Sequence, residues 1–173
     1  VNLLHEPPDR RVEPEERAHQ FISQRARPIA ALHVQQFVHR HGRLLGGVRP
    51  EEVLFTSCAT ESNNTAVFGT AAANPERRHI VTTAVEHPAI YSVAKELERR
   101  GLEVDFLPVD RAGRLDMADF VRALRPDTLL VSVMHANNET GVIYPVEEMA
   151  RIAKETDPGI VVHSDATQTV GKL

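Results

Sequence analysis

The sequence is poor in cysteine, aromatic residues and lysine, and it contains no long apolar run. Its 173 residues include one cysteine, Cys58, two tyrosines and no tryptophan. A single thiol excludes an intramolecular disulfide and a cysteine-based zinc cluster. No apolar run approaches the roughly 20 residues of a membrane-spanning helix, and the first residues lack the apolar centre of a secretion signal. We therefore expect a cytoplasmic protein with no membrane partner.

The composition also counts against a nucleic-acid partner. Aromatic residues make up 5% of the chain and the isoelectric point is about 6.1, whereas domains that bind nucleic acids usually combine a basic patch with stacking aromatics. Apolar residues account for 42% and charged residues for 25%, which are ordinary values for a globular protein. The length is sufficient for one domain with a hydrophobic core.

The pattern along the chain changes after the first fifty residues. Residues 1–26 are polar and proline-containing, which predicts an irregular or loosely helical arm. Residues 28–45 have helical apolar spacing, and Gly46 and Gly47 would end that helix. Apolar strand-like runs then alternate with helical segments. We expect strands at 53–57, 79–85, 103–109, 128–134 and 160–164, and helices at 61–73, 88–100, 116–125 and 145–155.

The alternation of strands and helices defines the expected fold class. The strand-like runs are apolar almost throughout, which is typical of parallel strands covered on both faces. We therefore expect an α/β fold with a mainly parallel sheet flanked by helices. The domain would comprise residues 27–173, preceded by the arm at 1–26.

Polar clusters follow four of the expected strands. Ligands of open α/β sheets bind beyond the carboxyl ends of the strands, so these clusters are the candidate site. They are residues 58–64, 86–88, 135–141 and 165–168.

The first cluster allows two interpretations of Thr60. Its hydroxyl could simply cap the helix that follows. Alternatively, the hydroxyl and the free backbone N–H groups at the helix start could bind a phosphate. The sequence contains neither a GxGxxG pattern nor a Walker A pattern, so a nucleotide-binding loop of either type is not expected.

The second and third clusters, residues 86–88 and 135–141, also allow two interpretations each. His87 could be an ordinary loop histidine, or its ring could stack on an aromatic ligand and transfer protons near neutral pH. Asn137 and Asn138 could be turn formers, or an amide could donate to a ligand oxygen. Glu139 more readily fits a structural role in that turn.

Asp165 restricts the choice of ligand most strongly. It ends an apolar strand, where a carboxylate needs a cationic partner. The partner could be a basic side chain, a metal, or the protonated ring nitrogen of pyridoxal phosphate. A metal is less favoured because the nearby histidines show no ligand spacing such as HExxH. The four clusters together would suit a ligand that carries a phosphate, a flat ring, an oxygen and a basic ring nitrogen. Pyridoxal 5′-phosphate (PLP) has all four of these groups.

Several motifs resemble the class V aminotransferase-like family, and most closely its cysteine desulfurases. They are FTSCATESNNTA, TTAVEHPAIY, LPVD, MHANNETGVIYPVEEMA and HSDATQTVGK, in unbroken order over about residues 28–173. The resemblance implies the large domain of a fold-type I PLP enzyme that is usually homodimeric. It also implies conversion of L-cysteine to L-alanine, with persulfide sulfur passed to an acceptor or scaffold protein for iron–sulfur clusters or other sulfur-transfer pathways.

The resemblance also implies roles for individual residues. Ala59 and Thr60 would hold the cofactor phosphate, and His87 would stack on the pyridine ring and assist proton transfers as the catalytic residue of this chain. Cys58 stands where many relatives have glycine, and it is not expected to carry the persulfide.

Three further residues complete the implied site. Asn138 would lie near the cofactor and its 3′ oxygen, Asp165 would pair with the ring nitrogen, and Gln168 would bond the phenolic oxygen. No metal is implied.

The chain also departs from the family pattern. The family's cofactor-bearing lysine lies in a Ser-x-His-Lys motif that is not reached here, and the only lysines are Lys95, Lys154 and Lys172. The family's opening Asp-x-x-Ala-Thr-Thr motif and persulfide cysteine are also absent. We therefore expect the chain alone to be inactive, as part of a desulfurase completed by a second copy or a partner chain. The alternatives are another class V enzyme, such as a selenocysteine lyase or an aminotransferase-like enzyme, and a non-catalytic PLP-binding or interaction fragment.

Overall fold

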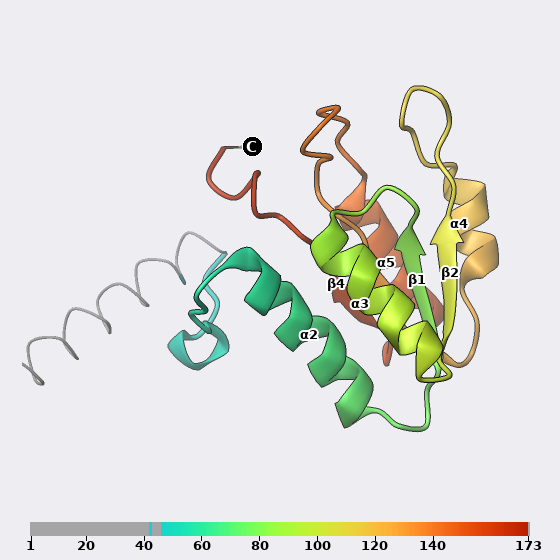
Figure 1. Ribbon diagram of the computed structural model, residues 1–173, viewed down its shortest axis with the longest axis horizontal. Helices are drawn as coiled ribbons and strands as arrows, with labels where there is room; N and C mark the ends of the chain where they lie inside the picture. Colours follow the sequence, from blue (N-terminus) through green and yellow to red (C-terminus); the bar gives the residue numbers. More distant parts are fainter. Residues whose placement is uncertain (1–41, 43–45, 173) are drawn as a thin grey trace, which may run out of the picture. The chain divides into compact units, whose positions relative to one another are not determined.

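The computed structural model describes residue 42 and residues 46–172 (Figure 1). The chain divides into two compact units, Val1–Leu54 and Phe55–Leu173. The predicted arm at 1–26 and almost all of the predicted helix at 28–45 lie outside the described residues. In the first unit, a short 3₁₀ helix, η1 (Pro50–Glu52), begins after Arg49, whose backbone N–H donates to the Glu52 carboxylate at 2.7 Å.

The second unit is built on a parallel sheet, as predicted, and this sheet has four strands. Its strands are β1 (His79–Thr83), β2 (Glu103–Leu107), β3 (Thr128–Ser132) and β4 (Val161–His163), in the order β2-β1-β3-β4. All three pairings are parallel. Every residue of the two central strands, β1 and β3, is buried, because both faces of the sheet are covered.

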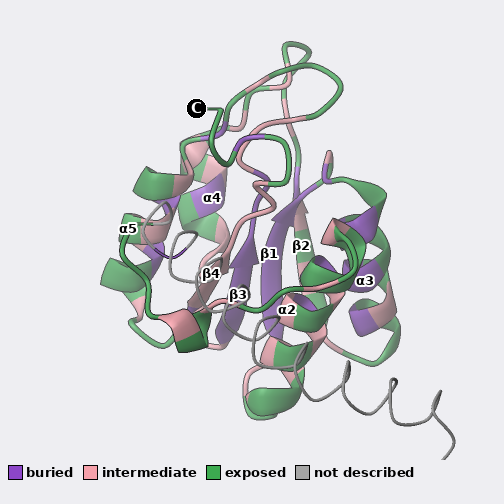
Figure 2. Ribbon diagram, turned by 90° about the vertical axis from the view of Figure 1, so that its left-hand side faces the viewer, coloured by how far each residue is buried: buried purple, intermediate pink, exposed green. Residues whose placement is uncertain are grey.

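Two helices cover each face of the sheet. Helices α2 (Ala59–Ala73) and α3 (Pro88–Arg99) pack against Ile80 and Leu130. On the other face, α4 (Met117–Ala123) and α5 (Val146–Thr156) pack against Val81 and Val131. Figure 2 shows the buried strands between these two helical layers. The predicted N-cap of α4 is confirmed, since the Asp116 side chain accepts from the Ala118 N–H at 2.8 Å.

The predicted strand at 53–57 is wrong. Residues 53–57 have no strand conformation, and the sheet consists of the four other strands alone. Leu54 is 72% exposed and Phe55 is 48% exposed. An apolar run becomes a strand only when a neighbouring strand supplies the ladder of hydrogen bonds, and residues 53–57 do not join that ladder.

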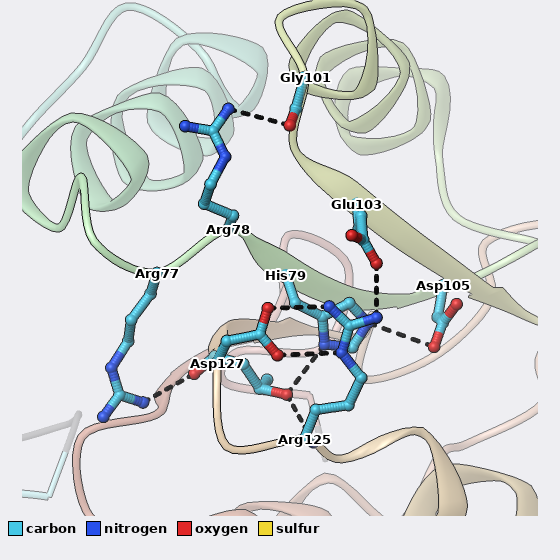
Figure 3. Close-up of polar contacts among 9 residues, drawn as sticks. Arg77, Arg78, His79, Gly101, Glu103, Asp105, Arg125 and Asp127 are labelled. Atoms are coloured by element: carbon cyan, nitrogen blue, oxygen red, sulfur yellow. Dashed lines mark hydrogen bonds and ion pairs between the residues drawn. The ribbon is translucent and has the colours of Figure 1, made fainter.

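A buried polar network closes the amino end of the sheet, opposite the strand ends that carry the polar clusters (Figure 3). His79 is fully buried, with Nε2 3.2 Å from Asp105 and Nδ1 2.9 Å from the Thr128 hydroxyl. Burial, followed by the charge of Arg125, lowers the pKa of His79. In the neutral ring, Nε2–H donates to the Asp105 carboxylate, so Nδ1 accepts from Thr128.

Replacing Thr128 by valine tests this network. The Thr128 oxygen also accepts from the Arg125 N–H at 2.8 Å, so T128V leaves two polar groups without their partner at nearly constant volume. We expect the free energy of unfolding to fall by about 2 kcal/mol, measured by urea denaturation. Thr156→Val is the matched control, because its exposed hydroxyl only donates to the Ile152 carbonyl and should change stability by about 0.5 kcal/mol or less. Equal effects of the two substitutions would contradict the prediction.

Candidate functional site

A pocket lies at the carboxyl ends of the strands, and it brings all six predicted site residues together. Asn63, Ala89, Met134, Ala136 and Thr167 complete its lining. The predicted residues come from four separate segments. Three of these segments follow β1, β3 and β4, whose carboxyl ends lie at one edge of the sheet, and the fourth is the start of α2. The six are Ala59, Thr60, His87, Asn138, Asp165 and Gln168.

The start of α2 forms one wall. Cys58 is the N-cap residue and its side chain makes no capping hydrogen bond, so the interpretation of Thr60 as the cap is wrong. Thr60 instead lies in the first turn with an exposed side chain. Glu61 turns back to Ser57, accepting from its N–H at 2.7 Å and its hydroxyl at 2.6 Å. The first N–H groups of a helix have no carbonyl partner within it. At the start of α2 the N–H groups of Glu61 and Thr60 face the Cys58 thiol and lower its pKa, and N–H groups in this position favour an anion.

His87 is held by its own helix. Its backbone is extended, as the following Pro88 requires, and its Nδ1 accepts from the Ala89 N–H at 3.1 Å as the cap of α3. A ring nitrogen that accepts this bond carries no proton, so the neutral ring carries its proton on Nε2. The exposed ring, which lines the pocket, therefore has its N–H donor at Nε2.

Asn137 and Asn138 have different roles. The Asn137 side-chain oxygen accepts from the N–H groups of Glu139 and Thr140 at 3.0 and 2.9 Å, and its amide donates to the Val85 carbonyl at 3.2 Å. Asn137 is thus the turn former. Asn138 is exposed and lines the pocket, which leaves its amide available to a ligand.

Asp165 is an ionised carboxylate at the base of the pocket. Its Oδ2 accepts from the Asn63 amide at 2.8 Å and its Oδ1 from the Thr167 N–H at 3.0 Å. Burial alone would raise the pKa of Asp165, but the hydrogen bonds from Thr167 and Asn63 outweigh it and hold the pKa below its ordinary value. The carboxylate therefore remains charged in a half-buried position and favours a cationic ligand group.

The described lysines lie outside the pocket lining. Lys95 pairs with Glu98 at 2.9 Å on α3, and Lys154 donates to the Pro158 carbonyl at 3.0 Å on the far side of the sheet. Lys172 reaches the rim, where its Nζ lies 3.4 Å from the Gln168 side-chain oxygen. No lysine belongs to the pocket lining of the described chain.

Glu86 is a residue beside the site that its local sequence does not single out. Its side chain is 7% exposed, and burial raises its pKa to about 7 against the opposing hydrogen bonds from Met134 and Thr83. The available signal was a glutamate directly after an apolar strand and before the His-Pro pair. Burial of such a carboxyl depends on contacts from distant segments, which the local sequence does not reveal.

The described residues contain neither a metal-ligand cluster nor a membrane-spanning helix. Residue 42 and residues 46–172 contain no group of three or more histidine, cysteine, aspartate or glutamate side chains that could hold a metal ion. Within the same part of the chain, no helix is both long enough and apolar enough to cross a membrane.

Comparison with known proteins gives a consistent family. Residues 23–173 match a family model described as Aminotransferase class-V. Cysteine desulfurase NifS of Azotobacter vinelandii is 50% identical over 131 residues, which are 76% of this chain and 32% of that protein. The chain thus spans about a third of the length of the curated relatives it matches.

Solved structures agree with this comparison. A NifS-like protein matches with a TM-score of 0.79 and 41% identity, over 83% of this chain and 40% of its own. The structure of SspA in complex with cysteine matches with a TM-score of 0.72 and 32% identity, over 82% and 41% of the two chains.

Proposed function

Because this chain belongs to the aminotransferase class V family, we propose that it forms the cofactor-binding part of a PLP-dependent cysteine desulfurase. The substrate would be L-cysteine, the products L-alanine and a protein-bound persulfide, and the sulfur would pass to an acceptor or scaffold protein that serves iron–sulfur clusters or other sulfur transfer. The relatives named cysteine desulfurase and the SspA structure with cysteine support this substrate. Assembly as a homodimer or with a partner chain, in the cytoplasm, belongs to the same proposal.

The observation that carries the proposal is the set of polar groups around one pocket. An ionised Asp165 favours a protonated ring nitrogen, and the start of α2 with Thr60 favours a phosphate. These are the two charged ends of PLP, so the residues present fit this cofactor. When bound, PLP would supply an electron-withdrawing ring that stabilises negative charge on the substrate.

Each pocket residue of this chain would then have its own role in binding PLP. Asp165 would keep the ring nitrogen protonated, while Ala59 and Thr60 would anchor the phosphate. His87 would cover the ring and present a proton at Nε2, since Nδ1 is occupied by the Ala89 N–H. Asn138 and Gln168 would donate to oxygens of the cofactor. The amine that attaches PLP would come from outside this pocket lining.

Asp165→Asn tests the proposal through cofactor affinity. The substitution keeps the side-chain shape but removes the charge that would pair with the ring nitrogen. A hydrogen bond between charged groups contributes about 2 kcal/mol, so we expect the dissociation constant for PLP to rise about thirtyfold, measured by equilibrium dialysis. The affinity for inorganic phosphate should stay the same, because phosphate would bind at the α2 end of the pocket.

Asp119→Asn is the control, because Asp119 pairs with Arg122 on α4 rather than facing the pocket. This variant should bind PLP as the wild type does. Failure of the wild-type chain to bind PLP, or equal PLP affinity of the wild type and D165N, would refute the assignment of the pocket.

A further inference from the structure

Glu86 is a buried carboxyl beside the pocket. One of its oxygens accepts two hydrogen bonds and the other accepts none within the described part of the chain. Its Oε1 accepts from the Thr83 hydroxyl at 2.7 Å and from the Met134 N–H at 3.0 Å. Its Oε2 is buried and has no hydrogen-bond partner within the described part of the chain. A bare buried oxygen is far more costly on an ionised carboxylate than on a neutral acid, so this environment favours the protonated side chain.

One charged group adds to the effect of burial on the pKa of Glu86. The negative charge of Asp165 raises the pKa of Glu86 further, after burial as the main cause. Tyr144, which donates to the Gly113 carbonyl at 2.9 Å, has its own pKa raised by burial and then by Glu86. No cation is among the causes that shift Glu86.

Glu86 joins two loops that supply the pocket. The residue next to it, His87, belongs to the loop after β1, while Met134 belongs to the loop after β3 that leads to Asn138. Both His87 and Met134 line the pocket. The same two loops are tied a second time by the 3.2 Å bond from the Asn137 amide to the Val85 carbonyl.

We propose that Glu86 is a positioning residue, whose neutral side chain clamps the loop after β1 to the loop after β3 and so fixes His87 and Asn138 on facing parts of the pocket. Ionisation leaves the charged Oε2 without a donor, and the clamp has to shift to hydrate it. The proposal rests on the proposed function only where PLP is used as the probe of the pocket.

The first test needs no cofactor. The amide proton of Met134 reports directly on the Glu86 carboxyl, so its NMR shift in the wild-type chain should titrate between pH 5 and 9 with a midpoint near 7. Glu86→Gln should abolish that titration. A flat Met134 shift in the wild type, or an unchanged titration in E86Q, would overturn the clamp whether or not the chain binds PLP.

The second test separates positioning from simple destabilisation. Glu86→Ala removes the acceptor that holds two donors, and we expect the dissociation constant for PLP at pH 6 to rise about three- to tenfold. Glu86→Gln retains an acceptor oxygen of similar shape and should restore affinity to within about twofold of the wild type. Glu148→Ala, at an exposed position of α5, is the control and should leave PLP affinity unchanged.

The two tests distinguish failure of the Glu86 clamp from failure of the proposed function. Equal losses in E86A and E86Q, or no loss in E86A, would contradict positioning by the clamp. A wild-type chain that shows the Met134 titration but does not bind PLP would refute the proposed function and leave the clamp supported.

Discussion

Glu86→Gln is expected to remove a pH-dependent contribution to stability that amounts to about 2.5 kcal/mol between pH 5 and pH 8. The pKa of Glu86 is about 7 in the folded chain against an ordinary value of 4.5, and each pKa unit corresponds to about 1.4 kcal/mol. The folded chain therefore holds a proton that the unfolded chain releases. This contribution is fully present below about pH 4.5 and is lost as the pH rises through 7.

The measurement is the free energy of unfolding by urea at pH 5, 6, 7 and 8. The difference in unfolding free energy between E86Q and the wild type should move in favour of the variant by about 2.5 kcal/mol from pH 5 to pH 8. His79 and His163, whose pKa values burial lowers, act in the opposite direction, with stability lost as the pH falls below their ordinary values. They contribute equally to both proteins and cancel in the difference.

Glu148→Gln provides the matched control, since it makes the same chemical change at an exposed position of α5. Its stability should follow the wild type across the pH series. If E86Q also ran parallel to the wild type, Glu86 would be ionised in the folded chain at pH 5, and the buried acid would be refuted.

Phe120→Ala is expected to lower the free energy of unfolding by about 3–5 kcal/mol. Phe120 is fully buried on α4, in the core cluster with Val81, Val131 and Met149. Truncation removes most of a large apolar side chain and leaves a cavity that the sheet and α5 cannot fill by small movements. Chemical denaturation of the variant and the wild type under the same conditions measures the loss.

Val121→Ala is the control for Phe120, because Val121 is the next residue on α4 and is 50% exposed. Alanine has the higher helix propensity, so V121A should change stability by about 0.5 kcal/mol or less. Similar losses in the two variants would mean that α4 does not pack its Phe120 face against the sheet.

Most of the fold follows from local patterns in the sequence. The buried runs that became β1 and β3 are rich in apolar and β-branched residues, and the intervening segments carry helical spacing and recognisable ends such as Asp116 and Gly101. These features predict a parallel sheet with helices on both faces. The strand predicted at 53–57 is wrong because apolar composition alone does not provide a neighbouring strand.

Most of the candidate site was predictable for the same reason, because His87, Asn138 and Asp165 lie in segments that follow parallel strands. Parallel pairing brings three of these segments to one edge of the sheet. Thr60, at the start of α2 and with no strand before it, joins them in the same pocket. The resemblance to a known family supplied their individual roles, which the PLP experiments above are designed to test.

The sequence by itself determined the order of strands and helices, the polar residues at the strand ends and the family. Only the tertiary structure decided which groups are buried, which nitrogen of His87 accepts the Ala89 N–H and how far burial raises the pKa of Glu86. The Glu86 carboxyl meets the Met134 N–H across 48 residues of chain. Burial and hydrogen bonds of this kind come from segments that meet only in the folded chain, and they set the protonation state of a side chain.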